Sequence, residues 1–99
     1  MKTYQHPEVK NVPLTAVMHA LSEPCRIDIM RQLLKNTELA CSAIQLTVSK
    51  STASHHFDVL RSSGLIHTRT QGVKCLNSVR INEINQHFPG VISLIKESK

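Results

Sequence analysis

The sequence predicts a mainly α-helical fold that carries a β-hairpin, in the order α-α-α-α-β-β-α, and that pairs with a second copy of itself. Three observations lead to this fold class. Before Gly64, apolar residues recur at the i, i+3, i+4 spacing of amphipathic helices. After Gly64, the chain becomes rich in Ile, Thr and Val around a second glycine, which is typical of a hairpin. The tail holds more apolar residues than a single domain of 99 residues has room to bury.

The first three helices follow a polar arm. Residues 1–12 are polar and lack periodicity, so we expect an arm that is mobile or lies on a partner subunit, and a single domain over residues 13–99. Apolar spacing predicts helices over Pro13–Leu21 and Cys25–Leu34. A third, shorter helix is predicted over Glu38–Leu46 on the same grounds.

The fourth predicted helix covers residues 49–63. Ser49 or Ser51 supplies an N-terminal cap, and Gly64 suits the left-handed position that ends helices. Only Thr47-Val48-Ser49 separates this helix from the third one. Two helices joined by a three-residue turn are typical of a helix-turn-helix.

A hairpin wing is predicted over residues 66–79. Ile66–Thr70 and Val73–Val79 read as strands, and Gln71-Gly72 suits the two-residue turn between them. The order of these elements indicates a winged helix-turn-helix.

The tail is predicted to contain a turn or short helix near Asn82–His87 and a new helix from about Pro89. A second subunit packed against this tail and the Leu14 helix would cover its apolar side chains, and we therefore expect a homodimer. These tail residues are Val91, Ile92, Leu94 and Ile95.

The helix over residues 49–63 divides into two faces. The face expected to pack inward holds Ala53, His56, Phe57 and Leu60. The face expected to point outward holds Lys50, Ser51, Ser54, His55, Asp58 and Arg61. Small hydroxyl groups beside cationic side chains suit the DNA major groove, where they can bond to base edges and phosphates.

The charge distribution supports an anionic partner. The formal net charge is +5, and between Lys50 and Arg80 five basic residues accompany a single acid, Asp58. Arg69 and Lys74 flank the predicted wing tip, where they can reach phosphate or the minor groove. The predicted DNA-binding residues are Lys50, Ser51, Thr52, Ser54, His55, Arg69 and Lys74. A winged-helix module that only contacts proteins is the alternative.

Other chemistry finds less support. The sequence has no glycine-rich phosphate loop and no nucleophile elbow, so we predict that the protein is not an enzyme, with no catalytic residues and no cofactor. Cys25, Cys41 and Cys75 form no C-x-x-C pair, and no histidine spacing completes a metal site. A thiol-responsive or metal-responsive variant stays open. No apolar run is long enough to cross a membrane, and we expect a cytoplasmic protein.

Three stretches together resemble the ArsR/SmtB family of winged-helix repressors: LTAVMHALSEPCRIDIMRQLL, SKSTASHHFDVLRSSGLI and RTQGVKCLNSVR. The resemblance implies a homodimeric transcriptional repressor that reads a palindromic operator in double-stranded DNA and is released by an inducer. Metal sensors of that family often carry Cys-x-Cys where this chain has Ala40-Cys41-Ser42. Their second site, on the last helix, is interrupted here by Pro89. Neither familiar metal site is therefore expected.

Overall fold

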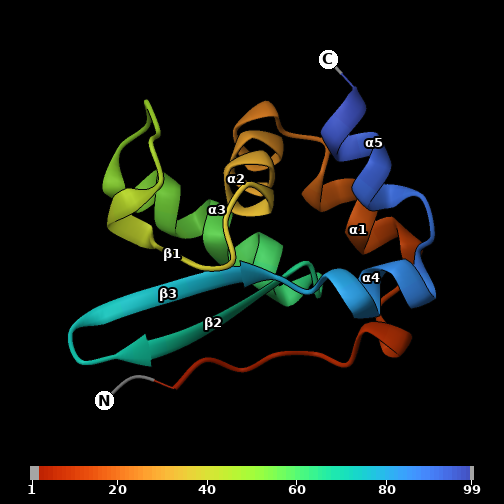
Figure 1. Ribbon diagram of the computed structural model, residues 1–99, viewed down its shortest axis with the longest axis horizontal. Helices are drawn as coiled ribbons and strands as arrows, with labels where there is room; N and C mark the ends of the chain where they lie inside the picture. Colours follow the sequence, from red (N-terminus) through yellow and green to blue (C-terminus); the bar gives the residue numbers. More distant parts are fainter. Residues whose placement is uncertain (1–2, 99) are drawn as a thin grey trace.

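The computed structural model describes residues 3–98, and it confirms the winged helix-turn-helix fold (Figure 1). A narrow sheet runs along one side of the molecule, with α2 and α3 above it and the last helices at one end. The elements in chain order are η1 (Val9–Asn11), α1 (Leu14–Ala20), α2 (Pro24–Leu34), β1 (Leu39–Ala40), η2 (Cys41–Ala43), α3 (Lys50–Ser62), β2 (Ile66–Gln71), β3 (Lys74–Val79), α4 (Ile81–His87) and α5 (Val91–Glu97).

The sheet has three antiparallel strands in the order β1-β3-β2. In the hairpin, Ile66 pairs with Val79 at the base and Gln71 pairs with Lys74 at the tip. The turn therefore consists of Gly72 and Val73, one residue later than predicted. Gly72 has a φ of 62°, a left-handed conformation that favours glycine.

The predicted helix over Glu38–Leu46 is wrong. Leu39 and Ala40 form β1, which pairs with β3, and only Cys41–Ala43 form a single 3-10 turn. The apolar residues of this nine-residue segment fit a short strand and a short helix about equally well, so backbone pairing with β3 decides the conformation. Three α-helices thus precede the hairpin and two follow it, within the described residues.

The core joins every layer of the fold. Side chains from α2, α3, β2 and α4 are completely or almost completely removed from solvent, and α2 supplies three of them. These are Ile29, Met30, Leu33, Leu60, Ile66 and Ile84. Because α2 packs against both α3 and α5, it holds α3 in a fixed position relative to the rest of the domain. Among residues 3–98, no helix has the length and apolar character needed to cross a bilayer.

Candidate nucleic-acid interface

The start of α3 is fixed by a side-chain cap. The Ser49 hydroxyl accepts a hydrogen bond from the Thr52 backbone amide at 3.3 Å and donates one to the Thr52 hydroxyl at 3.0 Å. This arrangement satisfies one of the free amides of the first turn. The helix ends before Gly64, whose φ of 79° confirms the predicted left-handed residue.

The two faces of α3 are as predicted at all but one position. His56, Phe57 and Leu60 are buried and Ala53 is half-buried. The outward side chains that are exposed are Lys50, Ser51, Thr52, Ser54, His55 and Asp58. The first half of the helix therefore presents hydroxyl, imidazole and ammonium groups to solvent on one continuous face.

Arg61 is the exception, because it is buried instead of exposed. Its Nε donates to the Thr68 hydroxyl on β2 at 2.9 Å, and its Nη1 contacts the Asp58 carboxylate at 2.7 Å. Its guanidinium also lies over the Tyr4 ring, 4.3 Å from the ring centre. A long side chain at the edge of the outward face can bend back onto its own protein, so Arg61 joins α3 to the wing and contributes no free charge.

The adjacent histidines have different roles. His55 is exposed, while His56 is buried as its inward position predicts. The Nδ1 atom of His56 lies 3.1 Å from Nη1 of the buried Arg26 and accepts its hydrogen bond, because an arginine can only donate. Arg26 also donates to the backbone carbonyls of His19 and Ala20, which end α1. His56 therefore connects α3 to the α1–α2 corner.

The wing carries fewer free charges than the sequence indicates. Arg69 is exposed, but its Nε and Nη2 atoms donate to the two carboxylate oxygens of Glu38, both at 2.8 Å. This guanidinium lowers the pKa of Glu38, and the carboxylate raises the pKa of Arg69 in return. Lys74, at the tip, has no ion-pair partner within the described residues. Sequence reasoning missed Glu38 because the segment that it begins was expected to be a helix, whereas β1, directly after Glu38, pairs with β3 at one side of the sheet.

The N-terminal segment lies along the outer side of the hairpin of its own chain (Figure 1). The Nε2 atom of His6 accepts a hydrogen bond from the Thr68 backbone amide at 2.9 Å. The His6 ring also stacks on the His67 ring, with 4.3 Å between the ring centres. The Pro7 carbonyl accepts a hydrogen bond from Arg80. Residues 4–8 thus do not require a partner subunit for their contacts, in contrast to the expected arm.

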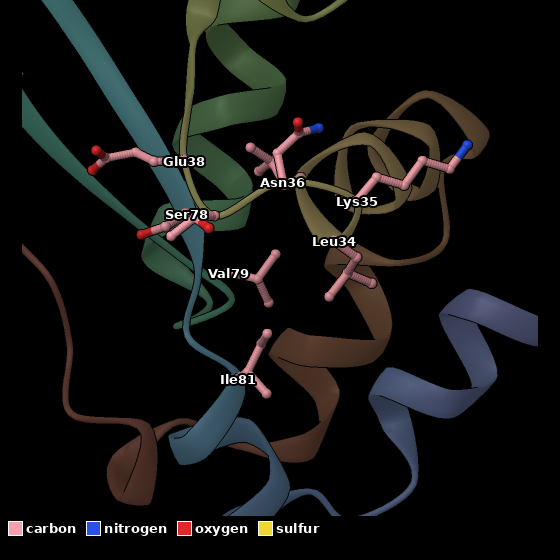
Figure 2. A pocket seen from close by; sticks show the side chains of 9 residues that line it. Leu34, Lys35, Asn36, Glu38, Ser78, Val79 and Ile81 are labelled. Atoms are coloured by element: carbon pink, nitrogen blue, oxygen red, sulfur yellow. The ribbon is translucent and has the colours of Figure 1, made fainter.

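A separate cavity of about 620 Å³ lies where the end of α2 meets β3 (Figure 2). The side chains of Leu34, Val79 and Ile81 point toward one another across it, while the Glu38 carboxylate points away. No residue of α3 or of the hairpin tip lines this space, so it lies apart from the candidate interface. Within residues 3–98, no group of three or more His, Cys, Asp or Glu residues is placed to hold a metal ion.

The two structural histidines predict a loss of stability in acid. Burial, followed by nearby cationic groups, lowers the pKa of both His6 and His56. Between the lowered folded pKa and the unfolded value of about 6.5, the unfolded chain binds more protons, so the free energy of unfolding decreases as the pH falls through this range. Urea unfolding from pH 7.5 to 5 should show this decrease, and replacing both residues by glutamine should flatten it. Replacement of the exposed His87 by glutamine serves as the control, and an unchanged slope in the double variant would contradict the assignment.

Comparison with known proteins agrees with this geometry. Residues 21–69 match a family whose description is "Helix-turn-helix domain". The chain is 32% identical to the HTH-type transcriptional regulator YceK of Bacillus subtilis strain 168, over 80% of this chain and 82% of that protein. An ArsR-like transcriptional regulator from Rhodococcus sp. RHA1 is 26% identical with a TM-score of 0.64, covering 75% of this chain and 71% of that one. An ArsR family transcriptional regulator has a TM-score of 0.68 at 20% identity, over 74% and 81% of the two chains.

Proposed function

This chain belongs to the ArsR family of winged helix-turn-helix proteins and is a DNA-binding transcriptional regulator; from this premise we propose that it is a homodimeric repressor of a palindromic operator. The observation that carries the proposal is the first half of α3, where polar side chains are exposed while the opposite face is held by buried contacts. Repression follows from occupancy, because a protein seated on a promoter excludes other proteins from the same duplex. An inducer would release the operator by favouring a form of the dimer in which the two α3 helices no longer fit successive major grooves.

The exposed side chains of α3 supply base and phosphate contacts in this proposal. Lys50 and His55 donate to guanine N7 or O6 in the major groove, and Ser51 and Ser54 bond to base edges or phosphates. Thr52 contacts a phosphate near the helix N-terminus. The hydrogen bonds of Arg26 and Arg61 fix α3 on the side that faces the protein. The exposed side chains of α3 therefore approach the groove on a rigid support.

The wing adds contacts beside the recognition helix. Lys74 lies next to the tip and is free to meet a phosphate or the edge of the minor groove. Arg69 reaches the duplex only if it exchanges its carboxylate partner for a phosphate. We therefore assign the electrostatic role of the wing chiefly to Lys74, with Arg69 as a conditional contact.

In the proposed complex, a second copy of the chain supplies the second DNA-binding helix. Leu14 and Met18 of α1 and Leu94 of α5 are 55%, 51% and 62% exposed, and they line one shallow apolar depression. Since α1 and α5 lie side by side, this surface is continuous (Figure 1). Covering it with the same surface of a partner produces a twofold dimer whose α3 helices enter successive major grooves, about 34–36 Å apart.

His55 provides the first test of the reading face. An operator is selected from a random duplex library, and its affinity is compared with that of a scrambled duplex by fluorescence anisotropy. We expect His55→Ala to reduce the discrimination between the two by about 1–3 kcal/mol, because one base contact is lost. The control is Gln86→Ala, which removes an exposed polar side chain from α4 outside the depression formed by α1 and α5. Equal losses on both duplexes would show that His55 contacts only the backbone, and no binding of any duplex would favour the protein-interaction module.

Removing the Glu38 carboxylate tests the conditional role of Arg69. We expect Glu38→Gln to bind the operator several-fold more tightly at low salt, because Arg69 becomes free to meet a phosphate. The slope of log affinity against log salt should steepen by about 0.9 for that added contact. The matched control is Glu83→Gln, which breaks the ion pair with Arg80 at the start of α4. If both variants leave the slope unchanged, Arg69 does not touch DNA.

A further inference from the structure

Cys41 and Cys75 are brought together by the register of the sheet. In the β1–β3 pair, Leu39 lies opposite Asn77 and Ala40 lies opposite Leu76. Cys41, directly after β1, and Cys75, directly before Leu76, are therefore the next opposed positions. Facing residues of antiparallel strands have Cα atoms about 4.5–5.5 Å apart, which falls within the range of about 4.4–6.8 Å that a disulfide requires.

The thiol groups of Cys41 and Cys75 lie close enough to interact with each other. Burial raises the pKa of the Cys41 thiol, and the Cys75 thiol raises it further through its charge and a hydrogen bond, whereas a hydrogen bond from Asn77 lowers it. The Asn77 amide donates to the Cys41 sulfur over 3.1 Å. The Tyr4 hydroxyl lies 2.9 Å from the Cys75 sulfur. The two thiols are thus neighbours with defined hydrogen-bond partners.

Both thiols also line a single cavity of about 430 Å³ between the wing and α3. Phe57 and Ile44 form part of its apolar lining, and Tyr4 lies beside the cysteines. Cys41 and Cys75 are each half-buried, so a small molecule that enters the cavity can reach their sulfur atoms. Cys25, on α2, is half-buried as well but does not line this cavity.

We propose that Cys41 and Cys75 form a dithiol site that closes reversibly to an intrachain disulfide by exchange with a low-molecular-weight disulfide. The thiolate of one cysteine attacks a sulfur of the small disulfide, giving a mixed disulfide and releasing one small thiol. The thiolate of the other cysteine then displaces the second small thiol. The protein loses two electrons and two protons, and the small disulfide gains them as two thiols, so the exchange balances without another reactant.

The disulfide joins the 3-10 turn that follows β1 to the wing. Cys41 lies in the segment that leads into α3, and Cys75 is adjacent to Lys74 near the hairpin tip. Closing a loop of about 35 residues restricts the unfolded chain and should raise the melting temperature by several degrees. The site therefore makes the anchoring of the wing respond to the thiol–disulfide balance, independently of whether DNA is bound.

The test uses the reduced full-length protein with oxidised glutathione. We expect the free thiols of the wild type to fall from three to one, with no glutathione retained, and peptide mapping to identify the Cys41–Cys75 link. Cys25→Ser, the matched control, should form the same link. In each of the variants Cys41→Ser and Cys75→Ser, glutathione should stay attached to the one cysteine of the pair that is left. Dithiothreitol should restore all thiols.

Three outcomes would overturn the proposal: stable glutathione adducts on the wild type, a link that includes Cys25, or a link between two chains. Circular dichroism of each reduced variant first establishes that it is folded. A Cys41→Ala and Cys75→Ala double variant should melt at the same temperature with and without oxidant. None of these measurements involves DNA, so a failure here is distinct from a failure of the proposed repressor function.

Discussion

Replacing Leu94 by aspartate should lower operator affinity by at least about 100-fold, because a monomer loses the second half-site and the avidity that it supplies. Leu94 is the most exposed of the apolar side chains shared by α1 and α5, at 62%. A carboxylate in its place would be buried without a partner in the proposed dimer, which costs several kcal/mol per subunit. Anisotropy with a full operator measures the affinity, and analytical ultracentrifugation measures the oligomeric state.

The matched control for this variant is Ile81→Asp. Ile81 is 42% exposed and lies at the start of α4, outside the depression formed by α1 and α5. We expect it to remain dimeric and to bind normally. A Leu94→Asp protein that is dimeric and binds with full affinity would place the subunit interface elsewhere.

The second large effect concerns Arg26. Replacing it by methionine, which keeps much of its aliphatic length, should reduce the free energy of unfolding by about 3 kcal/mol, because several buried polar groups lose their partner. The guanidinium donates to the Ala20 carbonyl at 2.7 Å, to the His19 carbonyl at 3.2 Å and to the His56 imidazole at 3.1 Å. It also places a positive charge at the C-terminal end of the α1 dipole.

Urea unfolding at pH 7.5 measures the effect of Arg26→Met. Lys35→Met is the control, since Lys35 is exposed just after the same helix and should change stability by no more than about 0.5 kcal/mol. If Arg26→Met costs less than about 1 kcal/mol, the α1–α2 corner is held by apolar packing alone. Loss of operator binding without loss of stability would instead indicate a shift of α3.

The elements with strong local signals were predictable from the sequence. Ser49 and Gly64 marked the ends of α3, and helical spacing separated its buried residues from its exposed ones. The change in residue types after Gly64 located the hairpin. These features depend on residues close together in the chain, so a pattern within a few positions contains the information.

The errors arose where contacts between distant residues decide the structure. Pairing with β3 makes residues 39–40 a strand, although their apolar spacing also fits a helix. Arg61 turns inward because Thr68 on the next strand offers it a hydrogen bond and Tyr4, far away in the sequence, offers it an aromatic face. The ion pair of Arg69 depends on the same misassigned segment, through Glu38. Net charge alone therefore overstated the positive surface available to DNA.

The placement of the N-terminal segment has a consequence for solubility. β2 is an outer strand of the sheet, and such strands present open backbone groups that can recruit a strand from another molecule. Here the Thr68 amide is already bonded to His6, and residues 4–8 run along that border. Shielding this border disfavours sheet-to-sheet aggregation. Deleting the segment would accordingly expose the open backbone groups of β2 to strand pairing with another molecule.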